Sequence, residues 1–412
     1  MNSEVTVERI ATADRGDGLA EPGSRGSNQS GMRAHNERLV LTLVRRHGAL
    51  AKAEIARTTG LSAQTVSVIM RQLEADGLLV KGDPVRGKVG QPSVPMRLAA
   101  EGAYFLGIKI GRRNEELVLI DFLGKVHGRV QRTHAYPHPE DTVSFALQAL
   151  RELTDPLSAE QKARIAGLGI AMPFEMWNWA RLIGVDPAEM ATWQDRDIKA
   201  ELAAQVPYPV YLQNDASCAC GAELVLGAQD TPRDFLYFYV GYFIGGGLVL
   251  NGTLYSGRSG NAGALGSMPV PGPGGSLQLI DVASLSGIEK LMEQEGLPTQ
   301  GLWGDPENWS VPPGIMDIWI ADAAKGIAHA IAASASLIDF ESVLIDGWIP
   351  AAVRDRLVQD VRTALARINM AGITPPEVNA GTVGPSARSL GAACLPLSER
   401  FLVDGQAFLK QG

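Results

Sequence analysis

Two short helical patterns joined by a tight turn, between residues 52 and 77, constrain the fold more than any other feature of the chain. The pattern of Lys52–Thr58 ends at Thr59-Gly60, and Ser62 stands where the N-cap of a further helix is expected. Four apolar residues of that helix recur at helical spacing and form its buried stripe: Val66, Ile69, Met70 and Leu73. The segment is therefore predicted to form a helix-turn-helix.

The face of this helix opposite the buried stripe is short and polar at its N-terminal end. Side chains of that kind reach base edges and phosphates when such a helix lies in the major groove of DNA. The residues expected to contact DNA here are Ser62, Ala63, Gln64, Thr65, Ser67 and Arg71.

Residues 81–95 are expected to form a basic, extended wing between two short strands. Leu78–Val80 begins one strand, Met96–Leu98 can return beside it, and Asn36–His47 supplies a preceding helix. The wing adds three expected DNA contacts: Arg86, Lys88 and Gln91. Residues 32–100 are therefore predicted to be a winged helix-turn-helix DNA-binding domain. The alternative is a three-helix packing domain that binds no ligand.

The charge of the chain is divided unevenly. Residues 31–100 contain eleven Lys and Arg against five Asp and Glu, whereas residues 101–412 carry a net charge of −12. A basic block on an acidic body is typical of a polyanion-binding module attached to a body that binds no polyanion. Chance clustering is the alternative. Residues 1–31, rich in Gly, Ser and charged residues, are expected to be a disordered tail.

The remaining residues, 101–412, alternate between strand and helix patterns. Three consecutive strands are predicted first, followed by a helix and a strand in turn, and a similar series then recurs. The strands are expected at 103–110, 117–122, 129–134, 166–171, 210–213, 235–240, 246–250 and 342–346, and the helices at 139–153, 197–205, 315–337 and 351–368. This repetition predicts two related α/β lobes with a cleft between them.

Composition excludes several classes of protein. Three cysteines in 412 residues cannot form a disulfide framework, which favours a reducing compartment. No apolar run reaches the length of a membrane span, and the N-terminal eighteen residues have acids and no apolar core. A cytoplasmic protein without a membrane partner is therefore expected.

Several motifs of the body are specific when taken together. They are Leu250–Gly266 (LNGTLYSGRSGNAGALG), Gly167–Pro173 (GLGIAMP), Asn214-Asp215-Ala216, Ile345-Asp346-Gly347 and Gly391-Ala392-Ala393. With the winged helix ahead of them, they resemble the transcription-regulator branch of the ROK family (repressors, open reading frames and kinases), which includes bacterial xylose and N-acetylglucosamine repressors. The resemblance implies an α/β body of two lobes, actin-like and hexokinase-like, with a sugar site in the interlobe cleft.

Kinase members of the family bind ATP and a metal ion in that cleft, and this sequence departs from their pattern. Their first phosphate loop resembles D-x-G-G-T, where this chain has Lys109, Gly111, Arg112 and Arg113. Their second resembles G-T-G-x-G-x-G, where the chain reads Gly241–Gly247 (GYFIGGG). Bulky side chains thus stand where phosphate oxygens approach the backbone. No enzymatic activity and no cofactor are expected.

The resemblance places the sugar contacts at five positions: Asn214, Asp215, Gly260, Asn261 and Ser267. In the kinases, the position of Asp215 is the base that accepts the sugar hydroxyl proton. Without phosphate loops, Asp215 is expected to hydrogen-bond sugar hydroxyls together with Asn214. The alternative role for Asp215 is N-cap of the helix that follows. Trp177 and Trp179 could stack on a sugar or pack within a lobe.

Two ligand positions of the family are changed here. The sugar-binding glutamate is Ala264, and the histidine that helps to hold a structural zinc is Ser267. The cysteines of that zinc site are absent from Pro271–Ser284, and Cys218 and Cys220 are expected to be buried thiols on a helix. No metal is therefore predicted. The loss of two polar contacts leaves three possibilities: a different ligand, weak binding, or a vestigial site.

The sequence thus favours a DNA-binding regulator. The resemblance to the family implies a repressor of carbohydrate genes, such as those of xylose metabolism. A homodimer, or a dimer of dimers, would bind a palindromic operator and release it when a sugar-like effector closes the cleft. The family's G-R-P turn in the wing, which is aimed at the minor groove, reads Gly90-Gln91-Pro92 here, so its arginine is replaced by Gln91. The alternatives are an effector-free dimeric regulator and a sugar kinase with a regulatory head.

Overall fold

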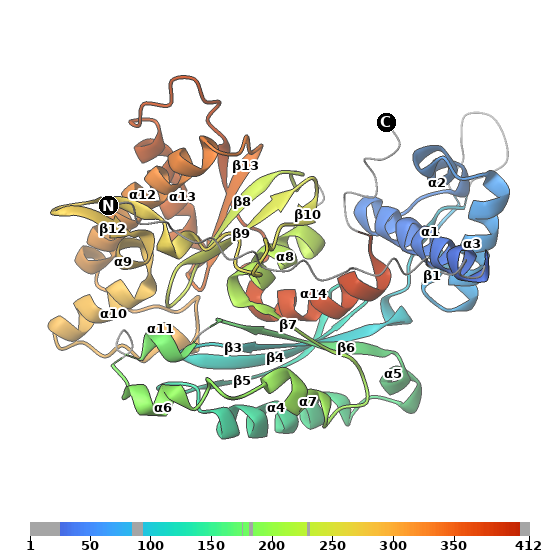
Figure 1. The fold of residues 1–412 in the computed structure, drawn as a ribbon, viewed down its shortest axis with the longest axis horizontal. Helices are drawn as coiled ribbons and strands as arrows, with labels where there is room; N and C mark the ends of the chain where they lie inside the picture. The colour runs from blue at the N-terminus through green and yellow to red at the C-terminus, as the bar shows by residue number, and fades with distance from the viewer. Residues whose placement is uncertain (1–24, 85–93, 175, 181–183, 229–230, 404–412) are drawn as a thin grey trace, which may run out of the picture.

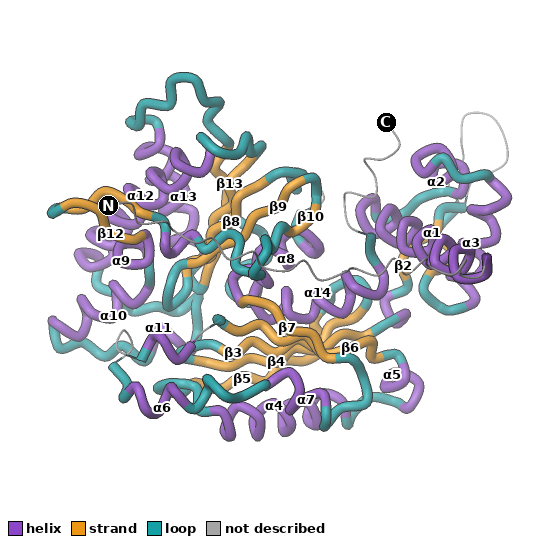
Figure 2. The backbone as a smooth tube through the Cα atoms, in the orientation of Figure 1, coloured by secondary structure: helices purple, strands orange, loops and turns teal. Residues whose placement is uncertain are grey.

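The computed structural model describes residues 25–403, apart from 85–93, 175, 181–183 and 229–230. A small head of three helices and a hairpin sits beside a larger body of two lobes (Figure 1). Helices, strands and loops alternate through the body, and each lobe is built around one sheet (Figure 2). None of the helices in the described ranges is both long and apolar enough to cross a bilayer.

The head has the expected winged-helix elements. They are α1 (Arg25–His47), α2 (Lys52–Thr59), α3 (Ala63–Ala75), β1 (Leu79–Lys81) and β2 (Met96–Leu98), with β1 and β2 antiparallel. Gly60 adopts a left-handed φ of 70° at the end of α2, as a tight turn requires. The Ser62 hydroxyl caps α3 by accepting a hydrogen bond of 3.1 Å from the Thr65 amide. The predicted stripe of Val66, Ile69, Met70 and Leu73 is buried.

Helix α1 is longer than expected. It begins at Arg25 rather than Asn36, so residues 25–31 of the predicted tail are helical, while residues 1–24 lie outside the described ranges. Once the packed part of a helix is formed, each added residue gains a backbone hydrogen bond without a new nucleation cost. The ion pair between Arg33 and Glu37, 2.9 Å and four residues apart, supports this extension.

The first lobe is a five-stranded sheet in the order β5-β4-β3-β6-β7. Its strands are β3 (Tyr104–Ile110), β4 (Asn114–Asp121), β5 (Val126–Thr133), β6 (Ile165–Met172) and β7 (Val210–Asn214). The first three pair antiparallel, and β6 and β7 then join in parallel. Helices α4 (Pro139–Thr154) and α7 (Ile198–Ala203) cover its outer face, and the short helices α5 (Ala159–Ala163) and α6 (Pro187–Ala191) lie in the connections (Figure 1).

The second lobe repeats this topology, as the sequence predicted. Its sheet has the order β10-β9-β8-β13-β14, again three antiparallel strands joined by two parallel ones. The strands are β8 (Phe235–Val240), β9 (Gly245–Leu250), β10 (Thr253–Leu254), β13 (Ser342–Gly347) and β14 (Glu377–Ala380). Further elements are α9 (Leu279–Ala283), α10 (Leu285–Gln294), α11 (Gly301–Gly304), α12 (Pro313–Ala335), α13 (Ala351–Leu365) and the hairpin of β11 (Pro269–Gly272) and β12 (Gly275–Gln278).

Two helices form a layer between the two sheets (Figure 1). Helix α8 (Asp215–Leu226) packs on β8, β9 and β10 of the second lobe, and α14 (Ala387–Phe401) packs on β3 and β6 of the first. The two helices also pack against each other along their length. A Cβ atom at Gly391 of α14 would lie 1.8 Å from the Cys218 carbonyl oxygen of α8. The glycine therefore permits a direct contact between the two backbones.

The head and the body share one hydrophobic cluster. Val40, Leu41 and Val44 of α1 belong to the same buried group as three body phenylalanines, Phe105, Phe122 and Phe401. The Phe122 and Phe401 rings are 4.9 Å apart, and the Phe105 and Phe401 rings meet edge to face at 5.8 Å. The Val403 amide also donates a 3.1 Å hydrogen bond to the Thr42 hydroxyl of α1. Packing thus fixes the head on the end of α14.

Candidate functional site

The face of α3 predicted to contact DNA is open to solvent. Ser62, Ala63, Gln64 and Arg71 are exposed, and Thr65 and Ser67 are partly exposed. Val68 lies among them with 51% of its surface exposed, unusually high for an apolar residue in a helix whose other face is buried. The Ser62 and Thr65 hydroxyls are 2.8 Å apart and cap the helix start. Contact of these residues with DNA remains a prediction.

The wing residues predicted to contact DNA lie outside the described ranges. These are Arg86, Lys88 and Gln91, together with Gly90 and Pro92. The stems of the wing are described: Leu79 pairs with Leu98, and Lys81 with Met96. Lys81 forms a 3.0 Å ion pair with Glu74 of α3, which ties the start of the wing to that helix.

Asn214 ends β7 and Asp215 begins α8, and the two side chains have different roles. The Asn214 side-chain oxygen accepts hydrogen bonds from the Ala216 and Ser217 amides, at 3.0 and 3.3 Å. Asn214 is therefore the N-cap, the role considered above for Asp215. Asp215 is buried, and its Oδ2 lies 3.1 Å from Nη1 of Arg388 in α14. The Asp215 carboxylate, which was expected to hydrogen-bond sugar hydroxyls, is thus held in a buried ion pair.

The other three predicted ligand residues lie on the glycine-rich segment after β10. Gly260 has a φ of 77°, and a Cβ there would lie 3.6 Å from the Phe174 ring. This brings the segment against the turn that follows β6. Asn261 and Ser267 are exposed. Within the described residues, none of the three forms a hydrogen bond with Asn214 or Asp215, so their role as ligand contacts remains a prediction.

The tryptophans near this region are committed mainly to packing. Trp193 is buried, and its indole nitrogen donates a 2.9 Å hydrogen bond to the Pro137 carbonyl. Trp177 is partly buried against the main core. The side chain of Trp179 lies outside the described part of the structure. Trp193 thus packs within the lobe, and stacking of Trp177 or Trp179 on a sugar stays a prediction.

Lys109, Arg112 and Arg113, which replace the kinase phosphate loop, all reach across to the second lobe. The Arg112 guanidinium lies 4.5 Å from the centre of the Phe243 ring, and that of Arg113 lies 5.0 Å from the Tyr242 ring. Arg113 also forms a 3.1 Å ion pair with Glu289 of α10. The ammonium of Lys109 lies 5.8 Å from the Trp348 ring and donates to the Asn114 carbonyl at 3.0 Å.

The two aromatic residues of the second loop, Tyr242 and Phe243, are therefore the partners of the two arginines of the first. Cationic side chains stacked on aromatic rings fill the place that the resemblance gives to nucleotide phosphates. The retained glycines have a structural reason. A Cβ at Gly246 would lie 2.3 Å from the Tyr237 carbonyl oxygen, and one at Gly247 would lie 2.4 Å from Cβ of Cys220. These glycines let β9 pack closely against β8 and α8.

The charge of Asp215 acts on three buried cations, Lys109, Arg112 and Arg388. Burial lowers the pKa of Lys109 well below its ordinary value, and the charge of Arg388 lowers it further. Burial also lowers the pKa of Arg112, although Asp215 opposes that effect. Burial acts in the same direction on Arg388, but Tyr239 and Asp215 outweigh it and keep the pKa of Arg388 above its ordinary value. Arg388 is thus the charged partner of Asp215.

Sequence reasoning missed Arg388. It is 173 residues from Asp215, and no local pattern joins the two. The available signal was composition: Arg388 precedes the small-residue run Gly391-Ala392-Ala393 in a helix that is otherwise largely apolar and buried. A charged side chain in such a helix needs a buried partner.

Within the described residues, no cluster of three or more His, Cys, Asp or Glu side chains has the arrangement of a metal site. Cys218 and Cys220 are buried in α8, and burial raises the pKa of both thiols well above the ordinary value. Both are therefore protonated and packed, as thiols of a helix core are.

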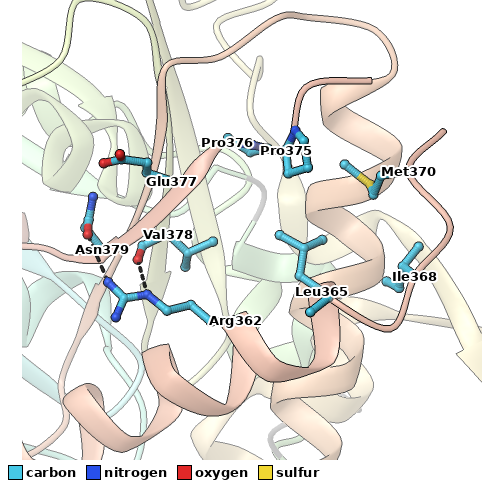
Figure 3. Close-up of a pocket in the computed structure, with 10 residues that line it drawn as sticks. Arg362, Leu365, Ile368, Met370, Pro375, Pro376, Glu377, Val378 and Asn379 are labelled. Atoms are coloured by element: carbon cyan, nitrogen blue, oxygen red, sulfur yellow. Dashed lines mark hydrogen bonds between the residues drawn. The ribbon is translucent and has the colours of Figure 1, made fainter. Parts of the chain in front are cut away.

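A cavity of about 630 Å³ lies in the second lobe, at the edge of its sheet formed by β14 (Figure 3). Its walls come from the end of α13, the following loop and β14, and Leu365, Ile368 and Met370 line it. Arg362 braces one wall by donating to the Val378 carbonyl at 2.7 Å and to the Asn379 side chain at 3.0 Å. None of the predicted ligand residues borders this cavity.

Comparison with known proteins identifies two family matches. The ROK family model matches residues 105–289, and the MarR family model matches residues 31–88. A transcriptional regulator of Mycobacterium bovis, Mb0495, is 25% identical over 87% of this chain and 84% of its own length. The xylose repressor of Bacillus subtilis is 24% identical over 59% of this chain and 62% of its own length.

Kinases are also among the relatives. The bifunctional enzyme NanE/NanK of Brucella melitensis is 30% identical over 57% of this chain but only 43% of its own length. Among solved structures, a ROK family transcriptional regulator, a homologue of the Escherichia coli MLC protein, superposes with a TM-score of 0.63. Its identity is 18%, and the match covers 92% of this chain and all of that one. At this identity the likeness establishes the fold.

Fold and comparisons together define a two-lobed α/β protein of the actin-like and hexokinase-like class, carrying a winged helix on its N-terminal side. The chain thus contains a ROK family domain, matched over residues 105–289, and a winged helix of the MarR type, matched over residues 31–88.

Proposed function

We propose that this protein is a sequence-specific DNA-binding transcription regulator whose ROK body senses a sugar or a related ligand. Residues 32–100 would bind DNA, and residues 101–412 would bind the ligand and hold two or more copies together. One observation carries the proposal. The polar N-terminal end of α3 is exposed, while the opposite face of the same helix is buried in a head that packing fixes to the body.

The relatives support this assignment. A transcriptional regulator matches over 87% of the chain and a xylose repressor over 59% of it, and a MarR-type module is present at residues 31–88. As expected from the sequence, the operator would be palindromic, the protein a homodimer or a dimer of dimers, and the target genes those of carbohydrate uptake or catabolism. In this reading the ligand would act by closing the cleft and weakening DNA binding.

The kinase alternative is disfavoured by the contacts of Arg112 and Arg113. Phosphoryl transfer needs backbone amides and a metal ion around the phosphates. Here two guanidinium groups stack on Phe243 and Tyr242 across the cleft. A nucleotide would have to displace both stacks and the ion pair of Arg113 with Glu289.

We therefore expect Mg-ATP to leave the melting temperature of the protein unchanged. A ligand at one hundred times its dissociation constant adds about 2.7 kcal/mol of stability, so binding would be visible as a shift of a few degrees. A coupled assay should detect no ADP release with D-glucose, D-xylose or N-acetylmannosamine. Sugar-dependent ADP release would establish the kinase alternative instead.

The function is tested by selecting operator sequences from random double-stranded DNA with the purified protein. The selected DNA is then titrated with and without the same three sugars. Enrichment of a two-fold symmetric site, with affinity lowered by one sugar, is the expected result. Enrichment without any sugar effect, together with a flat thermal-shift panel, would favour the effector-free regulator. No enrichment at all would contradict the proposal.

Two substitutions on α3 should separate base recognition from phosphate contact. Gln64→Ala removes a side chain suited to bidentate contact with a base and should weaken binding about tenfold or more, with relaxed choice at one base position. Arg71→Ala should weaken binding uniformly across sequences and reduce the slope of log affinity against log salt by about 1. Arg367→Ala removes an exposed arginine of the body and serves as the control, which should bind like the unaltered protein. Equal losses in all three variants would contradict the assignment of this face.

A further inference from the structure

Helix α14 has its two ends in the two functional regions of the molecule. Its N-terminal part lies in the interlobe layer beside α8, and its C-terminal end meets α1 of the head (Figure 1). Arg388, in its first turn, pairs with Asp215 at 3.1 Å, and Phe401, its last residue, packs in the cluster shared with the head. One continuous helix therefore connects the ligand cleft with the DNA-binding head.

The pair of Arg388 and Asp215 is held at one point of contact. Nη1 of Arg388 donates to the carboxylate, and the guanidinium lies 4.7 Å from the centre of the Tyr239 ring. Its Nε atom is buried and has no hydrogen-bond partner in the described part of the chain. A buried guanidinium with an unused donor is held less firmly than a bidentate pair. Sugar hydroxyls that donate to Asp215 would compete directly with Arg388 for the same oxygens.

The middle of α14 is in direct backbone contact with β3 and β6 of the first lobe. A Cβ at Gly169 would lie 1.8 Å from the Ala392 carbonyl oxygen, and one at Gly107 would lie 2.3 Å from the Ser389 carbonyl oxygen. Pro396 has no amide hydrogen for the Ala392 carbonyl, and that carbonyl points at Gly169 instead. Backbone contacts of this kind leave no soft side chain to absorb a displacement.

The C-terminal end of α14 contacts the head through main-chain and ring contacts. The Arg38 guanidinium of α1 donates to the Glu399 carbonyl at 3.4 Å, and the Thr42 hydroxyl accepts from the Val403 amide at 3.1 Å. The Arg45 guanidinium donates to the Phe122 carbonyl and lies 5.5 Å from the Phe122 ring. A shift of α14 along its axis would therefore change the position of α1 on the body.

We propose that Arg388 is the ligand-responsive residue of the cleft, and that α14 transmits its release from Asp215 to the DNA-binding head. This inference rests on the proposed function. A bound ligand replaces the hydrogen bond of Arg388 to Asp215, and α14 shifts as a result. The shift changes how α1 packs against Phe401 and Val403. DNA affinity then falls because the recognition helices of two copies no longer match the spacing of the operator.

The test is a set of variants titrated against the operator DNA that the unaltered protein selects. Asp215→Asn and Arg388→Gln each break the pair without a ligand and should each weaken DNA binding by about fivefold or more, which is the lower end of typical allosteric coupling. The double variant should bind like either single variant, because both changes act through one pair. Arg196→Gln breaks the 2.6 Å pair with Glu201 on the outer face of the first lobe and should leave DNA binding unchanged.

A second arm acts at the other end of α14. Thr42→Val removes the acceptor for the Val403 amide and should reduce the effect of Asp215→Asn on DNA affinity when the two are combined. If Arg388→Gln fails to fold, this arm still tests whether α14 transmits the change to the head. It uses Asp215→Asn, which is isosteric and is therefore expected to fold. Thermal melts report whether each variant is folded.

The outcomes are distinguishable. If the unaltered protein selects no DNA, the proposed function fails and this inference fails with it. If the unaltered protein selects DNA but the folded Asp215→Asn variant binds within about twofold of it, the inference alone is overturned. Equal losses in Asp215→Asn and Arg196→Gln would also overturn it, because the effect would then be one of general stability.

Discussion

Replacing Gly391 by alanine is expected to destabilise the body by about 2–3 kcal/mol, although alanine is the better helix former. In an exposed helix the same change would gain about 0.8–1 kcal/mol. At Gly391 the added methyl group would lie 1.8 Å from the Cys218 carbonyl oxygen, and this neighbour is backbone. Helices α8 and α14 would have to separate along their whole contact, and overpacking of this kind typically costs 1–3 kcal/mol or more. Thermal or urea unfolding measures the loss.

Gly287→Ala is the matched control. Gly287 lies in α10, and a Cβ there would make an ordinary contact of 3.6 Å with the Trp319 ring. Helix propensity then decides the result, so stability should stay equal or rise by up to about 1 kcal/mol. An equal fall in both variants would contradict the close contact between α8 and α14.

Replacing Phe401 by alanine is expected to have the largest effect on stability, about 3–5 kcal/mol. The ring is buried between Phe105 and Phe122 and touches the apolar face of α1. Its loss leaves a cavity where head and body meet, so the head should also become less firmly held. Unfolding experiments measure the first effect, and faster cleavage by trypsin at Arg97, in strand β2 of the head, reports the second.

Leu337→Ala removes a leucine of which 85% is exposed and should change stability by less than about 0.5 kcal/mol. If Phe401→Ala lowered stability while tryptic cleavage at Arg97 stayed as slow as in the unaltered protein, the shared cluster would not be what holds the head.

The winged helix and most strands were predictable because their signals are local. Thr59-Gly60, Ser62 and the stripe from Val66 to Leu73 encode a turn, a cap and a buried face within a few residues. The buried strands of both sheets read as apolar runs between turns, and the repeated order of the two lobes followed from them. Local rules of this kind need no knowledge of distant contacts.

The layer between the sheets was not predictable in the same way. Helix α14 is buried on several sides, so its Gly391-Ala392-Ala393 segment lacks the polar face that marks an amphipathic helix. The start of α1 was missed for the opposite reason, because residues 25–31 are polar and carry two glycines. Their helical state depends on the packed turns that follow.

In the candidate site, too, the residues with a local sequence signal were predictable, and their distant partners were not. The resemblance pointed to Asn214 and Asp215 as ligand contacts and to Arg112 and Arg113 as bulky residues in place of a phosphate loop. The partners of those residues could not be predicted from the sequence, because Arg388, Phe243 and Tyr242 come from other elements of the chain. Only the folded chain shows which side chains meet across the cleft.

The phenylalanine cluster also sets a condition on chimeric regulators. Joining a foreign head to this body at residue 100 would leave Phe105, Phe122 and Phe401 facing a helix that they were not shaped to meet. The Thr42 acceptor for the Val403 amide and the Arg45 donor to the Phe122 carbonyl would be lost at the same junction. A working exchange of DNA specificity should therefore keep the inner face of α1 and replace only the outward residues of α3.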